Sequence, residues 1–116
     1  CVSPEIHTLQ LDKDGLMPVD IHTFDCDTYI FENKQIKKIT LLNKEKNPHL
    51  SLVFDTPLVA LWAPTKNKPN CPFVCIEPWY GRCDSVGFKG ELQDRQWMQK
   101  LGSREVFDVS YDIIIE

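Results

Sequence analysis

Three features of the sequence predict an all-β protein built as an antiparallel β-sandwich. Residues 104–116 alternate apolar and polar side chains, which is typical of a half-buried strand. Residues 36–42 and 49–55 are two more strand-like runs, and the turn-forming connector NKEKNP between them predicts a hairpin. All eight prolines lie at or before position 78, at expected turns or strand ends. Short strands separated by polar turns favour a sandwich.

The remaining elements follow from the same patterns. Residues 5–11 predict a strand that ends at the turn 12–15. Residues 58–64 and 73–77 predict short apolar strands, and Pro78 is expected to stop the second of them. Such apolar strands need cover on both faces, and about six strands supply little of it. We therefore expect part of a larger sandwich rather than all of it.

Residues 90–102 allow two interpretations. Leu92, Trp97, Met98 and Leu101 would form an apolar stripe on a short helix that the flanking glycines could cap. The alternative is an irregular connector that holds Trp97 against the sheet. The pattern does not decide between them.

Composition limits the class of protein. A chain of 116 residues, 42% hydrophobic and 26% charged, fits one globular domain. The net charge of −4 argues against nucleic acid or an anionic membrane as partner, because no basic excess exists to neutralise phosphates. No apolar stretch approaches the roughly 18 residues of a membrane helix. The sequence has no signal-peptide pattern, and because it begins at Cys1 rather than methionine we expect a fragment or a processed product.

The five cysteines predict reduced thiols in a cytoplasmic protein. Their number is odd, their density is below that of disulfide scaffolds, and no CxxC occurs. A zinc site formed by Cys71, Cys75 and Cys83 is conceivable. We favour the simpler interpretation that the cysteines are small buried hydrophobic residues.

Glu77 is the main candidate site residue. On a strand it would share a face with Phe73 and Cys75, and burial among apolar groups favours the protonated form of a carboxylate. Such an environment suits a general base. Trp62, Trp79 and Tyr80 would offer ring platforms, Gly81 a bend and Arg82 a hydrogen-bonding fork. The competing structural interpretation is an internal Glu77–Arg82 ion pair, with the tryptophans in the core.

Asp25 and Asp27 form a second acidic candidate. By default they are turn-initiating residues that accept backbone N–H bonds. Their functional interpretation is a carboxylate that grips ligand hydroxyls. The three histidines, His7, His22 and His49, have no neighbours that suggest nucleophilic catalysis.

Nearly the whole chain resembles the aldose 1-epimerase (galactose mutarotase) family, and most closely the branch that includes the LacX protein. The resemblance rests on PFVCIEPWYGRCDSVGF at 72–88, GELQDR at 90–95 and SREVFDVSYDIII at 103–115. FDCDTYIF at 24–31, the hairpin after it and LVALWAP at 58–64 also match.

The resemblance implies a many-stranded supersandwich that interconverts the α and β anomers of a hexose. It implies that Glu77 is the general base and that no metal or organic cofactor takes part. It places a sugar-binding aspartate at Asp27, with Asp25 close enough to leave the choice of aspartate open. Trp62, Trp79 and Arg82 are the other expected sugar contacts, from their side-chain types.

The chain also departs from the family. The family's catalytic histidine, a second sugar-binding histidine and an arginine belong to an N-terminal half that this sequence does not contain. Residues 1–116 therefore resemble the C-terminal portion of such a domain, with the base and without the acid, and the N-terminal portion would be their partner. The alternatives are a carbohydrate-binding β-sandwich without catalysis and a purely structural β-domain.

Overall fold

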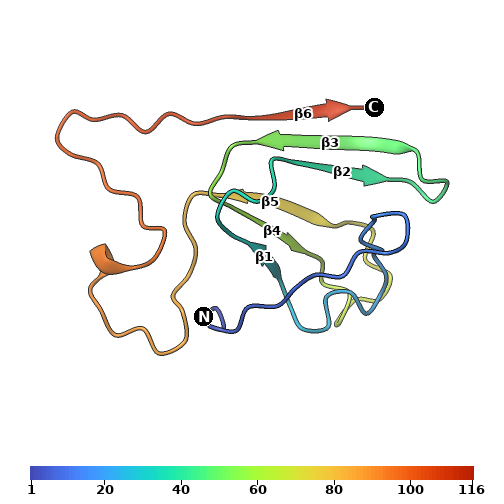
Figure 1. Ribbon diagram of the computed structural model, residues 1–116, viewed down its shortest axis with the longest axis horizontal. Coiled ribbons are helices and arrows are strands. Elements are labelled where there is room, and N and C mark those ends of the chain that lie inside the picture. The colour runs from blue at the N-terminus through green and yellow to red at the C-terminus, as the bar shows by residue number, and fades with distance from the viewer.

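The computed structural model describes residues 1–116 and contains two antiparallel three-stranded sheets (Figure 1). The strands are β1 (Tyr29–Phe31), β2 (Lys38–Leu42), β3 (Pro48–Phe54), β4 (Leu58–Trp62), β5 (Cys75–Trp79) and β6 (Tyr111–Ile115). One sheet has the order β1-β4-β5 and the other β2-β3-β6. A single 3₁₀ turn, η1 (Leu92–Asp94), is the only helical element. The predicted all-β class is confirmed, and the arrangement fits a β-sandwich.

The predicted hairpin forms between β2 and β3. Ile39 lies opposite Leu52 and Thr40 opposite Ser51 in the ladder. The connecting turn is held by the side-chain oxygen of Asn43, which accepts hydrogen bonds from the backbone N–H groups of Glu45 and Asn47 at 3.0 and 2.9 Å. An asparagine that bonds nearby backbone in this way favours a turn over a continued strand.

The strand that carries Glu77 is shifted from its expected position. It spans Cys75–Trp79 rather than 73–77, and Pro78 lies inside it, opposite Val59. The expectation that Pro78 stops the strand is therefore wrong. Proline is tolerated here because β5 is an edge strand, where a missing N–H donor need not break a ladder.

The hydrophobic core is small, and β4 is buried on both faces, since Leu58, Val59 and Ala60 are each at most 1% exposed. Leu52, Phe54 and Val59 form its buried centre, and Ile76 of β5 packs against them. Side chains alternate along a strand, so Glu77 points to the opposite face of β5 from Ile76. Glu77 is half-buried there, and Phe73, the expected apolar neighbour, lies outside the strand and is exposed.

The structure also decides three other segments: residues 5–11, residues 90–102 and the last strand. Residues 5–11 form no strand, and Ile6 is 97% exposed, because no neighbouring strand pairs with this backbone. Residues 90–102 form the irregular connector except for η1, and the carbonyl of Trp97 closely approaches Gly81. The last strand covers only Tyr111–Ile115 of the predicted 104–116, because β3 ends at Phe54, opposite Tyr111.

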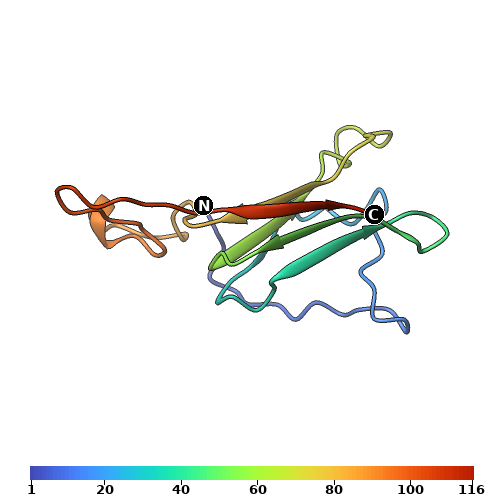
Figure 2. The same cartoon turned by 90° about the horizontal axis from the view of Figure 1, so that it is seen from above.

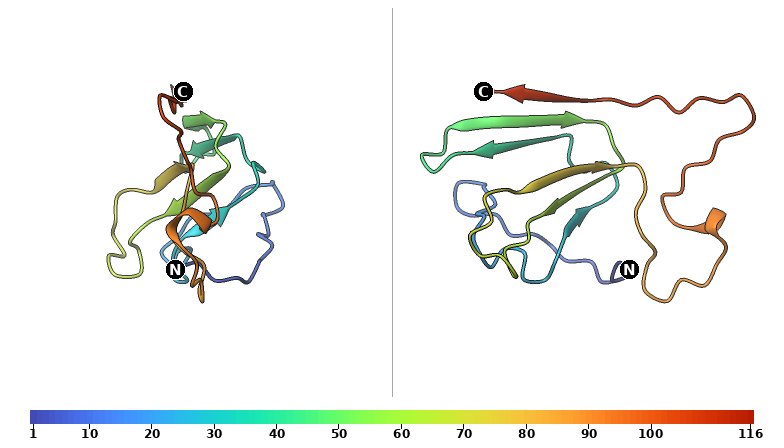
Figure 3. Two further views of the ribbon diagram at one scale, coloured as in Figure 1. Left: turned by 90° about the vertical axis from the view of Figure 1, so that its left-hand side faces the viewer. Right: turned by 180° about the vertical axis from the view of Figure 1, so that it is seen from behind.

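The connector and the residues that follow it extend away from the sheets. Figures 2 and 3 show residues 86–110 projecting beyond the ends of β3 and β5. The N-terminal segment runs along the side of the molecule opposite β6. The only tie of that segment to this region is a short parallel bridge between Val2 and Ser85. The structure contains no helix with the length and apolar character needed to cross a membrane.

Candidate functional site

A pocket of about 350 Å³ lies where the loop before β1 meets the loop after β4 and the outer face of β5. Its volume is within the range of small-molecule sites, roughly 300–1,000 Å³. It is lined by Phe24, Asp25, Asp27, Thr28, Trp62, Ala63, Pro64, Lys66, Asn67 and Glu77. Three residues predicted from the sequence, Asp27, Trp62 and Glu77, thus meet in one pocket although they come from separate segments.

The sheet register explains why Trp62 and Glu77 face the same space. Glu77 of β5 lies opposite Ala60 of β4, and Trp62 is two residues further along β4 on the same face. Residues in this diagonal relation have Cα atoms about 7–8 Å apart, within reach of an aromatic side chain. Ala60, which lies between them on this face, contributes only a methyl group and is itself fully buried.

The carboxylate of Glu77 is oriented by a neighbour on its own strand. The indole Nε1–H of Trp79 donates a hydrogen bond of 3.1 Å to Oε2 of Glu77. Both residues lie on the outer face of β5, two positions apart. Trp79 itself does not line the pocket. This bond leaves Oε1 without a protein partner.

Asp25 and Asp27 both line the pocket, and their carboxylates have different partners. The carboxylate of Asp25 is 3.0 Å from Nδ1 of His22 and forms an exposed ion pair with it when that histidine is protonated. The carboxylate of Asp27 accepts one hydrogen bond, of 3.0 Å, from the hydroxyl of Thr28. Asp27 also has φ of 77°, a conformation that few residues other than glycine adopt and that clusters at binding sites.

Lys66 and Asn67 are pocket residues that sequence reasoning missed. The Nζ of Lys66 donates a 3.2 Å hydrogen bond to the backbone carbonyl of Asp25. That contact joins the loop after β4 to the loop before β1. The sequence signal was the position of this polar loop directly after an apolar strand, since such loops carry function more often than their strands do.

Arg82 lies outside the pocket and is engaged elsewhere. Its Nε donates to Oε1 of Glu32 at 2.5 Å, and its other nitrogens bond the carbonyl of Cys83 and the side chains of Ser85 and Gln96. Only 5% of the side chain is exposed. The Glu77–Arg82 ion pair that the structural interpretation required is therefore wrong, because a different glutamate holds the guanidinium.

The cysteines are free thiols, as expected, but none of them is buried. Cys71 and Cys75 are half-buried and the other three are exposed, so their expected role as buried hydrophobic residues is wrong. Burial, and then the charges of Glu77 and Cys71, raise the pKa of the Cys75 thiol above 9.0. No group of three or more histidine, cysteine or acidic side chains lies close enough to hold a metal ion.

A second and larger hollow, about 500 Å³, lies along the connector. It is lined by Glu91, Leu92, Gln93, Met98, Gln99 and Lys100. No predicted site residue reaches it and no strand holds its walls in place. Functional groups need rigid support, so the pocket at Glu77 is the better candidate site.

Comparison with known proteins gives a distant match. Two curated proteins of Lactococcus lactis subsp. lactis match 106 residues, or 90% of this chain: Protein LacX, chromosomal, at 28% identity and Protein LacX, plasmid, at 26%. The chain spans about a third of the length of these relatives, since the match covers 34% of each. No family model and no solved structure matches the chain. The similarity agrees with the branch of proteins that the sequence motifs resemble.

Proposed function

We propose that residues 1–116 are the C-terminal portion of an aldose 1-epimerase-like protein that interconverts the α and β anomers of a hexose. The observation that carries the proposal is the meeting of Asp27, Trp62 and Glu77 in one pocket. These residues supply a hydroxyl ligand, an aromatic surface and a base. The motifs around Glu77 and the distant similarity to LacX proteins support the same function.

In this proposal Glu77 is the general base. Its Oε1 takes the proton of the anomeric hydroxyl while an acid protonates the ring oxygen, and the bond between C1 and the ring oxygen breaks. The open-chain aldehyde rotates about C1–C2, and reversal of both proton transfers closes the ring on the other face. The sugar is neither oxidised nor reduced, so the reaction needs proton transfer alone.

The pocket contributes binding and orientation as well. Trp62 offers its ring face to the apolar side of a pyranose, and Asp27 accepts hydrogen bonds from sugar hydroxyls. Trp79 positions the base by holding Oε2 of Glu77. Arg82, predicted as a sugar contact, would act here only by holding Glu32 and the connector in place.

The acid comes from residues outside these 116 in this proposal. None of the ten residues that line the pocket is a histidine. His22 comes nearest, through its contact with Asp25, but it is largely exposed. The same observation favours the alternative, a carbohydrate-binding β-sandwich without catalysis, for the 116-residue chain by itself.

Polarimetry of freshly dissolved α-glucose and α-galactose tests the proposal on the full-length gene product. We expect Glu77→Gln to slow mutarotation by about 10²–10⁴-fold, the usual contribution of a general base. Glu91→Gln, an exposed glutamate on the connector, is the matched control and should leave the rate unchanged. A Glu77→Gln protein as active as its parent would overturn the assignment. Sugar binding by calorimetry without anomer exchange would favour the binding protein.

A further inference from the structure

The inner face of the sheet β2-β3-β6 changes from buried to exposed within one strand spacing. Ile113 of β6 lies directly opposite Leu52 of β3, so both side chains point to the core side. Leu52 is 5% exposed, whereas Ile113 is 56% exposed. Tyr111 and Ile115, opposite Phe54 and Leu50, are exposed in the same way. The core face therefore continues onto β6 with nothing covering it.

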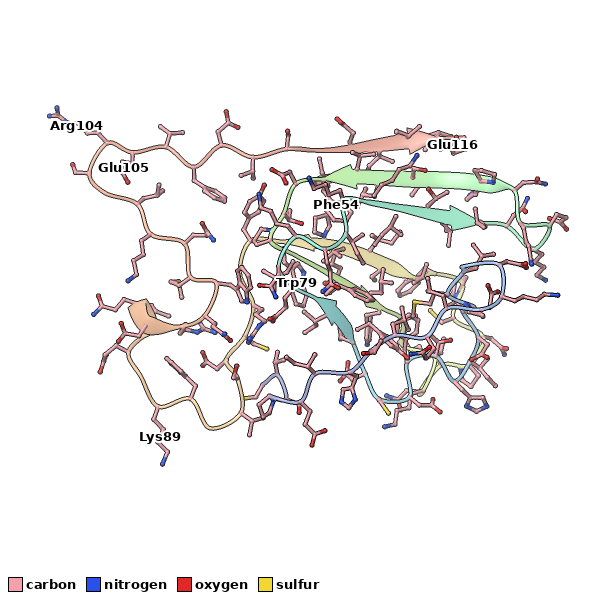
Figure 4. The ribbon with its side chains drawn as sticks, in the orientation of Figure 1. Phe54, Trp79, Lys89, Arg104, Glu105 and Glu116 are labelled. Carbon is pink, nitrogen blue, oxygen red and sulfur yellow. The ribbon has the colours of Figure 1, made fainter.

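The residues before β6 extend this surface. Residues 105–110 continue the line of β6 beyond the end of β3 and pair with no strand, and Figure 4 shows Arg104 at the far turn and Glu116 at the opposite end. Phe107 and Val109 of this segment lie on the same side as Tyr111 and Ile113 by alternation, and both are exposed. The segment is tied to the rest of the chain by Phe107, whose ring packs edge-on against Tyr80 with centroids 5.1 Å apart. We call residues 105–115 the open strand.

The whole chain exposes more surface than its size requires. A compact monomer of 13.5 kDa exposes about 6,500 Å², whereas this chain exposes 8956 Å², or about 2,400 Å² more. Its radius of gyration is 16.3 Å against about 13 Å for a compact chain of 116 residues. An excess of this size matches what large permanent interfaces bury.

The outer edge of β6 fixes the kind of partner. Its backbone N–H and C=O groups pair with β3 on one side only, so the other side offers a ladder to a further strand. An apolar ligand would cover the side chains and leave these polar groups unpaired. The partner is therefore an extended polypeptide segment.

Charge argues against a second copy of the chain as that partner. The polar face of the open strand carries Asp108 and Asp112 and no basic residue, and Glu116, just beyond its end, falls on the same face. Two copies paired antiparallel around Asp112 would place two carboxylates directly opposite each other. Pairing around Ile113 would put each Asp112 diagonal to Asp112 and Glu116 of the other copy. Like charges in such positions destabilise a ladder.

We infer that the open strand pairs with a β-strand from the part of the protein that lies outside these 116 residues. This strand carries large apolar side chains on the core side and lysine or arginine on the other. The LacX relatives provide such a length, because the 106 matched residues are 34% of each and imply chains of about 310 residues. The inference rests on the proposal that residues 1–116 are a portion of a longer protein.

Hydrogen exchange followed by mass spectrometry tests the inference on the full-length gene product and on residues 1–116. We expect amides of 106–115 to exchange about a hundredfold or more slowly in the full-length monomer than in the shorter chain. Equal exchange in both, a gene product no longer than 116 residues, or protection found only in a dimer would each overturn it. Mutarotation is measured separately, so an inactive protein with a protected open strand would reject the proposed function alone.

Two variants of the full-length protein sharpen the test. Ile113→Lys places a charge on the covered face and should lower the Tm by about 10 °C. Ser103→Lys adds the same charge at an exposed polar turn residue and should leave the Tm within about 2 °C. Equal Tm values for the two variants would overturn the inference.

Discussion

Trp79 donates its indole N–H to Oε2 of Glu77 at 3.1 Å, from two positions further along the same face of β5. Trp79 was expected to contact the sugar, and in the structure its indole instead holds the proposed base. The partner of the carboxylate is thus a neutral donor, and Arg82 pairs with Glu32 instead. A free carboxylate oxygen at a pocket wall is the group that proton abstraction needs.

The Trp79–Glu77 bond predicts a specific NMR response. In the 116-residue chain we expect the indole N–H of Trp79 to exchange slowly and to exchange faster in Glu77→Ala, because its acceptor is removed. The indole of Trp62, on the neighbouring strand, is the internal control and should change little. An unaltered Trp79 signal would show that the bond does not form in solution.

Kinetics of Trp79→Phe in the full-length protein separate positioning from sugar binding. Phenylalanine keeps the ring and loses the donor, so we expect kcat to fall about tenfold, the value of one hydrogen bond to a charged group, with little change in KM. A rise in KM at constant kcat would instead assign Trp79 to the sugar, as the sequence predicted.

The two aspartates of the pocket are expected to differ in sugar binding. Asp27→Asn should weaken hexose affinity about tenfold or more by calorimetry, since its carboxylate is bonded only to Thr28. Asparagine tolerates the positive φ of Asp27, so the backbone is preserved. Asp25→Asn should change affinity less, because Asp25 is shared with His22. The reverse order would assign the sugar contact to Asp25.

Arg82 is expected to matter for stability. Arg82→Ala removes a buried guanidinium from Glu32, Ser85 and Gln96, and should cost about 3 kcal/mol in urea denaturation. Lys34→Ala breaks an exposed pair with Asp55 and should cost about 0.5 kcal/mol or less. Equal losses in the two variants would contradict the structural role of Arg82.

The raised pKa of the Cys75 thiol leads us to expect a loss of folding stability at alkaline pH. Its folded pKa is raised above 9.0 by burial, then by Glu77 and Cys71, so the fold prefers the protonated thiol. The stabilisation is complete below pH 9.0 and declines as the pH rises through the folded pKa. Urea denaturation at pH 8 and 10 should show a smaller decline in Cys75→Ala than in the parent. Cys83→Ala, an exposed thiol, should decline like the parent.

Local patterns were sufficient for the elements whose partners are close in sequence. The hairpin of β2 and β3 and the apolar strand β4 could be predicted, because alternation, turn residues and apolar runs are properties of short segments. Residues 5–11 and 104–110 show the same alternation and form no strand. A strand exists only where another backbone pairs with it, and that partner is not visible in the segment itself.

For the candidate site too, the sequence indicated some features and the tertiary structure decided the rest. The sequence by itself singled out Glu77 and Trp62 from their types and local settings, and the family resemblance pointed to Asp27 beside Asp25. Only the tertiary structure decided that these three share a pocket, that Lys66 joins two of its loops, and that Arg82 pairs with Glu32. Those relations depend on the register of β4 with β5 and on loops brought together from distant parts of the chain, and long-range packing alone sets that geometry.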